Sequence, residues 1–169
     1  KADLKGKNLS AVNLSKMNLE GMDFTRAFMK SANLRSANLT RANLTRVNFV
    51  GADLTGANLT GANLTGANLT GANLTRTNLT KVSLAGLILS KANLTEDVLA
   101  GKDLTGADMH GVILSKANLA GAKLAGVSLT EADLTEADLT GADLTGANLT
   151  GANLTGANLT RTNLRGAIR

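Results

Sequence analysis

Apolar residues recur at every fifth position along the chain. From Leu4 to Leu164 there are 33 repeats without a slip, and the central residue is leucine in all but four of them. On an α-helix a step of five residues advances by about 500°, so the leucines would form no single stripe. In a flat strand they would alternate between the two faces. A chain that turns a corner every five residues points them all at one axis, so the period predicts a solenoid.

The residues around each leucine follow a fixed order. Two positions before it is usually alanine, as in Ala52, and one before is asparagine or aspartate in 26 of the 33 repeats. Threonine usually follows, and all 18 glycines stand two positions after. The alanine should point inward beside the leucine. Because nine of these last positions hold lysine or arginine, we expect the corner to accept ordinary residues and glycine to be a small exposed filler there.

The motif Ala-Asn/Asp-Leu-Thr-Gly resembles the signature of the pentapeptide-repeat family over the whole chain. The leucine-rich form with glycine at the corner is most similar to the cyanobacterial members. The resemblance implies an all-β fold, a right-handed quadrilateral β-helix with four repeats, hence 20 residues, per coil. Residues 1–169 would then form a single domain of about eight coils.

Charged departures from the motif fit a turn of 20 residues. Residues that stack on neighbouring coils lie about 4.8 Å apart, where opposite charges stabilise modestly. At this spacing the sequence predicts two stacked charge ladders, Asp103, Lys123 and Asp143, and Arg76, Glu96, Lys116 and Glu136.

Two similar segments flank an irregular stretch. Residues 51–79 match residues 136–164 at 27 of 29 positions, which indicates an internal duplication, or two short neighbouring pentapeptide-repeat proteins joined in frame. Residues 83–128 hold six of the seven departures from asparagine or aspartate. There Asp97 and Lys102 occupy the inward alanine position, and we predict that they form an inward ion pair. The stretch is open to two interpretations, decay of a tolerant scaffold or a partner site.

The composition offers no catalytic or cofactor chemistry. There is no cysteine, so neither a disulfide nor a thiolate metal site can form. The single histidine, His110, stands at an outward position, which favours a solvated side chain over a general base. Asp133, Asp138 and Asp143 are five residues apart and should point from successive faces, so they cannot converge on one cation. We expect a non-enzyme without cofactor or metal.

Four non-catalytic functions fit a rod of this kind. A structural scaffold for protein–protein interaction, with an unknown partner, is the one we favour. Some family members resemble B-DNA and protect DNA gyrase, which implies an acidic rod, whereas this chain carries a net charge of +5. Residues 1–50 are basic, yet aromatic residues for stacking on bases are nearly absent, which counts against nucleic-acid binding. The 18 outward threonines would suit ice binding.

The expected partner surface is an apolar strip of Phe28, Val50 and Ile88 on one outer face. The two ends of the rod would expose unpaired backbone edges, which invite pairing with another chain. Three explanations are open: charged residues oppose such pairing, rods associate end to end, or a cap has been removed. The charged residues at the ends are Lys1, Lys5, Lys7, Arg165 and Arg169. The sequence has neither a leader nor an apolar run that could span a membrane. A cytoplasmic location is therefore the default expectation.

Overall fold

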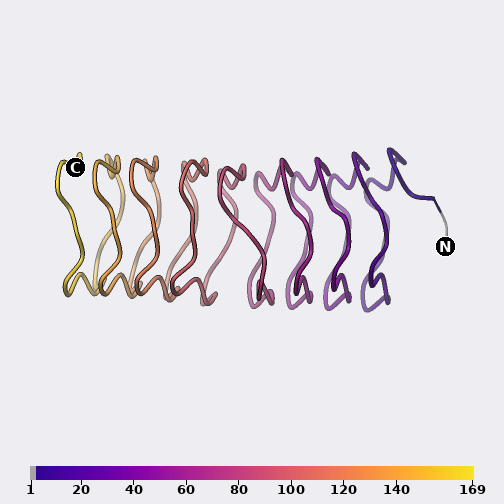
Figure 1. The fold of residues 1–169 in the computed structure, drawn as a ribbon, viewed down its shortest axis with the longest axis horizontal. Helices are drawn as coiled ribbons and strands as arrows, with labels where there is room; N and C mark the ends of the chain where they lie inside the picture. Colours follow the sequence, from indigo (N-terminus) through magenta and orange to yellow (C-terminus); the bar gives the residue numbers. More distant parts are fainter. Residues whose placement is uncertain (1–2) are drawn as a thin grey trace.

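A computed structural model describes residues 3–169 of the chain, so the charge at Lys1 lies outside the described residues. The backbone winds into an elongated rod with the two termini at opposite ends (Figure 1). The rod is a right-handed quadrilateral β-helix, as predicted. None of the described residues forms a helix long and apolar enough to cross a membrane.

The walls consist of isolated parallel bridges between residues 20 apart. They run from Asn8↔Phe28 to Asn148↔Ile168, and residues 3–169 contain neither a helix nor a strand longer than one bridge residue. The N–H of a central leucine donates to the next coil, as Leu54 does to the carbonyl oxygen of Asn73 at 2.8 Å. The N–H of Asn73 donates back to Ala52 at 2.9 Å. This register confirms the predicted coil of four repeats.

The core is a narrow column of leucine and alanine side chains. From Leu19 to Leu149 the central residues are buried, and the inward alanines between them are nearly all buried as well. The central leucines of the first and last coils, such as Leu4 and Leu164, pack against this column but stay partly exposed. Small side chains suffice because a five-residue wall leaves little space between opposite faces.

Every corner of the described rod adopts a left-handed backbone. The values of φ at the corners lie between 55° at Ser31 and 71° at Gly106, and 15 of these residues are not glycine. The expectation that glycine is only a filler was therefore wrong. Positive φ is a requirement of the turn, and lysine, arginine, glutamate, serine or alanine adopts it at a conformational cost of about 1 kcal/mol or more.

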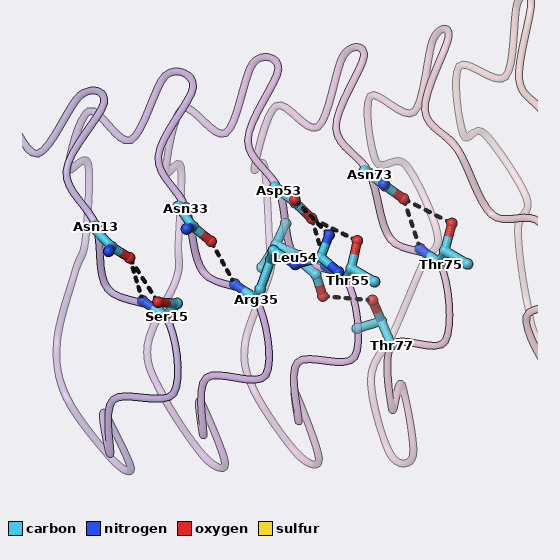
Figure 2. Close-up of polar contacts among 10 residues, drawn as sticks. All are labelled: Asn13, Ser15, Asn33, Arg35, Asp53, Leu54, Thr55, Asn73, Thr75 and Thr77. Atoms are coloured by element: carbon cyan, nitrogen blue, oxygen red, sulfur yellow. Dashed lines mark hydrogen bonds and ion pairs between the residues drawn. The ribbon is translucent and has the colours of Figure 1, made fainter.

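Asparagine and threonine form a repeated local pair on the outside of each wall (Figure 2). The Oδ1 atom of Asn73 accepts the N–H of Thr75 at 3.1 Å and its hydroxyl at 2.7 Å. This is an Asx turn, in which a short polar side chain replaces a backbone acceptor two residues on. The outward polar residues therefore close the corner rather than merely face water.

Candidate functional site

The regular stacking of the walls is interrupted near the middle of the rod, where the described residues lack the bridges Asn63↔Ser83, Asn78↔Val98 and Ser83↔Asp103. A cleft of about 630 Å³ opens between residues 76–81 of one coil and residues 96–102 of the next. The trace in Figure 1 is also least regular in this central part. We call residues 76–84 and 96–104 the joint, since they are the facing parts of the two coils that separate there.

The carboxylate of Asp97 is buried inside the joint without a hydrogen-bond partner. The residue is 2% exposed, and neither of its oxygens accepts a hydrogen bond from the described residues. Burial raises the pKa of Asp97 to about 7. An inward aspartate thus replaces the alanine that lets neighbouring coils close.

Lys102 does not pair with Asp97, contrary to the sequence prediction. Its Nζ donates instead to the carbonyl oxygens of Leu79 at 2.7 Å and Val82 at 3.2 Å, and no ion pair joins the two side chains within the described part of the chain. The long lysine stem reaches back to the preceding coil. There the carbonyl oxygen of Val82 accepts no backbone N–H within the described residues, and that of Leu79 also accepts the N–H of Val82 at 3.0 Å. Burial lowers the pKa of Lys102.

Backbone hydrogen bonds that recur elsewhere are absent at the joint. In the preceding step, Leu59 donates to Asn78 at 2.9 Å and Gly61 donates to Thr80 at 2.9 Å. The corresponding N–H groups of Leu79 and Lys81 have no acceptor among the described residues, and the facing carbonyl groups of Val98 and Ala100 have no donor there. The coils therefore present an open row of backbone groups to the cleft.

The outward side chains on both sides of the joint are exposed. Asn78 is exposed, whereas Asn58, one coil earlier in the same column, is half-buried. Val98 stands in that column as well and is 70% exposed, more than any other large apolar side chain described. The cleft and the absence of a bridge between the described residues Asn78 and Val98 show that the facing coils stand apart here.

The two predicted charge ladders are stacked, and part of each forms ion pairs. Lys123 bridges both Asp103 and Asp143 through its backbone, and its Nζ lies 3.9 Å from Asp103. In the second ladder Nη2 of Arg76 lies 3.4 Å from Oε2 of Glu96, and Nζ of Lys116 lies 3.9 Å from Oε2 of Glu136. No ion pair joins Lys123 to Asp143, or Glu96 to Lys116, among the residues described. The ladders are exposed, so each pair contributes little to stability.

The three residues of the predicted apolar strip lie on one face but are not contiguous. Phe28 is 52% and Ile88 39% exposed, whereas Val50 is half-buried. Asn48 and Asn68 stand between Phe28 and Ile88 in the bridge column. At about 4.8 Å per coil, the two outer members are roughly 14 Å apart.

His110 lies in a local polar contact on the same face. Its Nδ1 atom lies 2.9 Å from the hydroxyl of Thr130, and Nε2 lies 3.8 Å from Glu131. Within residues 3–169, no three histidine or carboxylate side chains gather as metal ligands. Asp133, Asp138 and Asp143 each bond instead to the threonine two residues on.

The sequence indicates three residues of the joint but neither the facing coil nor their arrangement. Asp97, Val98 and Lys102 are three departures from the motif within six residues. That density is the signal for a local break, because two inward alanines and one outward asparagine are lost together. The open backbone row follows from it and is visible only in the fold.

The family of pentapeptide repeats matches this chain in eight copies, over residues 2–41, 30–61, 57–96, 98–130, 113–151 and 132–168. This chain is a pentapeptide-repeat protein. The solved structure of HetL, a pentapeptide-repeat protein involved in heterocyst differentiation regulation from the cyanobacterium Nostoc sp. strain PCC 7120, is 37% identical. The match covers 95% of this chain and 73% of HetL, with a TM-score of 0.62.

Two further solved structures are more distant from this chain. Full-length QnrB1, a plasmid-mediated fluoroquinolone resistance protein, is 19% identical over 91% of this chain and 89% of its own, with a TM-score of 0.46. Rfr23 from the cyanobacterium Cyanothece 51142 is 23% identical over 96% and 88%, with a TM-score of 0.34. A comparison with curated proteins gives no match.

Proposed function

We propose that this pentapeptide-repeat protein is a non-catalytic scaffold that binds a partner protein on the side wall of the rod. The observation that carries the proposal is Phe28, which replaces a polar residue in the outward column and leaves 52% of its surface exposed. An exposed aromatic residue is a frequent anchor of protein interfaces. The similarity to HetL, a protein involved in regulation, supports a role in binding rather than in catalysis.

The test is a pull-down with the full chain and with the double variant Phe28→Asp, Ile88→Asp. Both changes introduce a residue that the motif uses at this column, so the fold should be retained. Asn148→Asp, in the same column but far along the rod, is the matched control. We expect the double variant to lose partners that the wild type and the control retain. An unchanged set of partners would show that this face is not the interface.

A further inference from the structure

The joint leaves backbone groups unpaired on both of its walls. The N–H groups of Leu79 and Lys81 have no acceptor, and the carbonyl groups of Val98 and Ala100 have no donor, among the residues described. In the regular steps these same positions bond along the rod axis to the next coil. The unpaired donors and acceptors therefore face each other across the cleft rather than solvent at the side.

The complementary chemistry is that of an extended peptide backbone. A strand presents N–H and carbonyl groups along its edges, and adding a strand to an open row of such groups is a recurrent mode of peptide recognition. An unpaired edge is a ready template for this pairing. One wall of a coil has five residues and spans about 15 Å, so a segment of similar length covers it. The cleft of about 630 Å³ lies along this wall.

Side chains around the cleft add preferences to the backbone pairing. Val98 is an apolar side chain with 70% of its surface exposed, and a bound segment would cover it. Arg76 is already paired with Glu96 at 3.4 Å, whereas Lys81 makes no ion pair within the described residues. Asp97 is buried behind the wall, so its charge does not balance that of Lys81 at the surface. The rim therefore favours an acidic ligand.

We propose that the joint is a binding slot for an extended, acidic peptide segment of a partner protein, held by backbone hydrogen bonds to the open row of residues 79–81 and 98–100. This deepens the proposed function and rests on it, since the segment would belong to the partner that the scaffold binds. The slot lies on a different wall from Phe28, because residues 78 and 98 belong to another bridge column.

The decisive variant closes the joint by restoring the motif. We name Asp97→Ala, Val98→Asn and Lys102→Ala together the triple variant; it supplies two inward alanines and one outward asparagine, so it moves the chain toward its own consensus. Ile113→Asn restores the motif at an outward position elsewhere and is the matched control. Lys81→Glu reverses an exposed charge and leaves the joint open.

A display library of random octapeptides is selected on the immobilised full chain and counterselected on the triple variant. Binding of an enriched peptide is then measured by fluorescence anisotropy. We expect at least tenfold weaker binding to the triple variant, several-fold weaker binding to Lys81→Glu, and unchanged binding to Ile113→Asn. A copy of the peptide N-methylated at alternate residues should not bind, because it cannot form strand hydrogen bonds.

Hydrogen exchange reports on the joint without any variant. The amides of Leu79, Lys81 and Val98 should exchange rapidly in the free chain and become protected with the peptide. The proposal is overturned if these amides are protected in the free chain, if no peptide is enriched over the triple variant, or if the N-methylated peptide binds equally well.

The pull-down separates this proposal from the proposed function. Partners that the triple variant retains but Phe28→Asp, Ile88→Asp loses would leave the scaffold function standing and overturn the slot. Partners lost by the triple variant alone would support the slot and move the interface away from Phe28.

Discussion

Outward polar residues hold the corner that follows them in each wall. Asn73 holds the N–H and the hydroxyl of Thr75 with one oxygen, which fixes the corner that follows. At Val98 that acceptor is missing, and the N–H of Ala100 has no partner within the described residues. A net contribution of about 1 kcal/mol per hydrogen bond is modest. Ile88 and Ile113 lack the same acceptor, yet Leu69 and Leu94 still donate to their carbonyl oxygens, so this loss alone does not open the wall.

The buried carboxylate of Asp97 should make the stability of the chain depend on pH. Burial raises its pKa from 3.8 to about 7 in the folded chain, so the folded state holds a proton that the unfolded state releases above about pH 4. The free energy of unfolding is therefore highest, as far as Asp97 is concerned, below about pH 4. It falls as the pH rises from about 4 to about 7. We expect a higher thermal unfolding midpoint at about pH 5 than at about pH 8.

Asp97→Asn is the matched control for this dependence. The variant should lack the fall in the midpoint, and because the two chains differ only at residue 97, the difference isolates Asp97. The hydrogen bond from Thr25 lowers the pKa of Asp23 to about 2, and its effect therefore lies at more acidic pH. Equal pH profiles for the wild type and the variant would mean that Asp97 is hydrated in the folded chain.

At the scale of the coil, the corner is the strained element. Each coil turns four times through a left-handed residue, and glycine is the only residue that adopts this conformation without a clash of its Cβ. Gly71 has a φ of 64° and nothing within 4 Å of the position a Cβ would take. Ser31 adopts a φ of 55° at another corner. Substitutions at these two positions therefore test the effect of backbone strain on stability.

Substitutions at these two corners should change the free energy of unfolding in opposite directions. We expect Gly71→Ala to lower the free energy of unfolding by about 1 kcal/mol, because the strain exceeds the entropy lost by the unfolded chain. Ser31→Gly should raise it by a smaller amount. Thermal unfolding followed by circular dichroism measures both. If Gly71→Ala were as stable as the wild type, glycine would be only a small filler at the corner, which is the expectation from the sequence.

At the scale of the whole molecule, the sequence predicts the architecture of the rod but not the structure of the joint. A fixed period states which side chain faces inward, so the leucine column and the register of 20 residues follow from the pattern together with the family resemblance. The period does not state whether the coils close around an inward Asp97. Nor does it show where a long side chain such as Lys102 finds an acceptor, because flexible stems reach the previous coil as easily as a neighbour.

At the largest scale, the rod is a one-dimensional stack whose stability depends on contacts between neighbouring coils. The joint is the step at which those contacts are fewest, since the N–H groups of Leu79, Lys81 and Val98 lack backbone partners among the described residues. The parts of the rod on either side of it are therefore coupled only weakly. In such an array, a weak step divides unfolding into separate transitions.

We expect the wild-type chain to unfold in more than one step and the triple variant to unfold in one. The backbone bonds regained by Leu79, Lys81 and residue 98 should each contribute about 1 kcal/mol, and removal of the unpaired carboxylate adds to this gain. Circular dichroism gives the number of transitions, and hydrogen exchange should locate the first opening at residues 76–104. Ile113→Asn should keep the wild-type behaviour, because it restores the motif without closing the joint. A single sharp transition of the wild type, with uniform protection across the joint, would contradict this account, because it would mean that the two parts are already fully coupled.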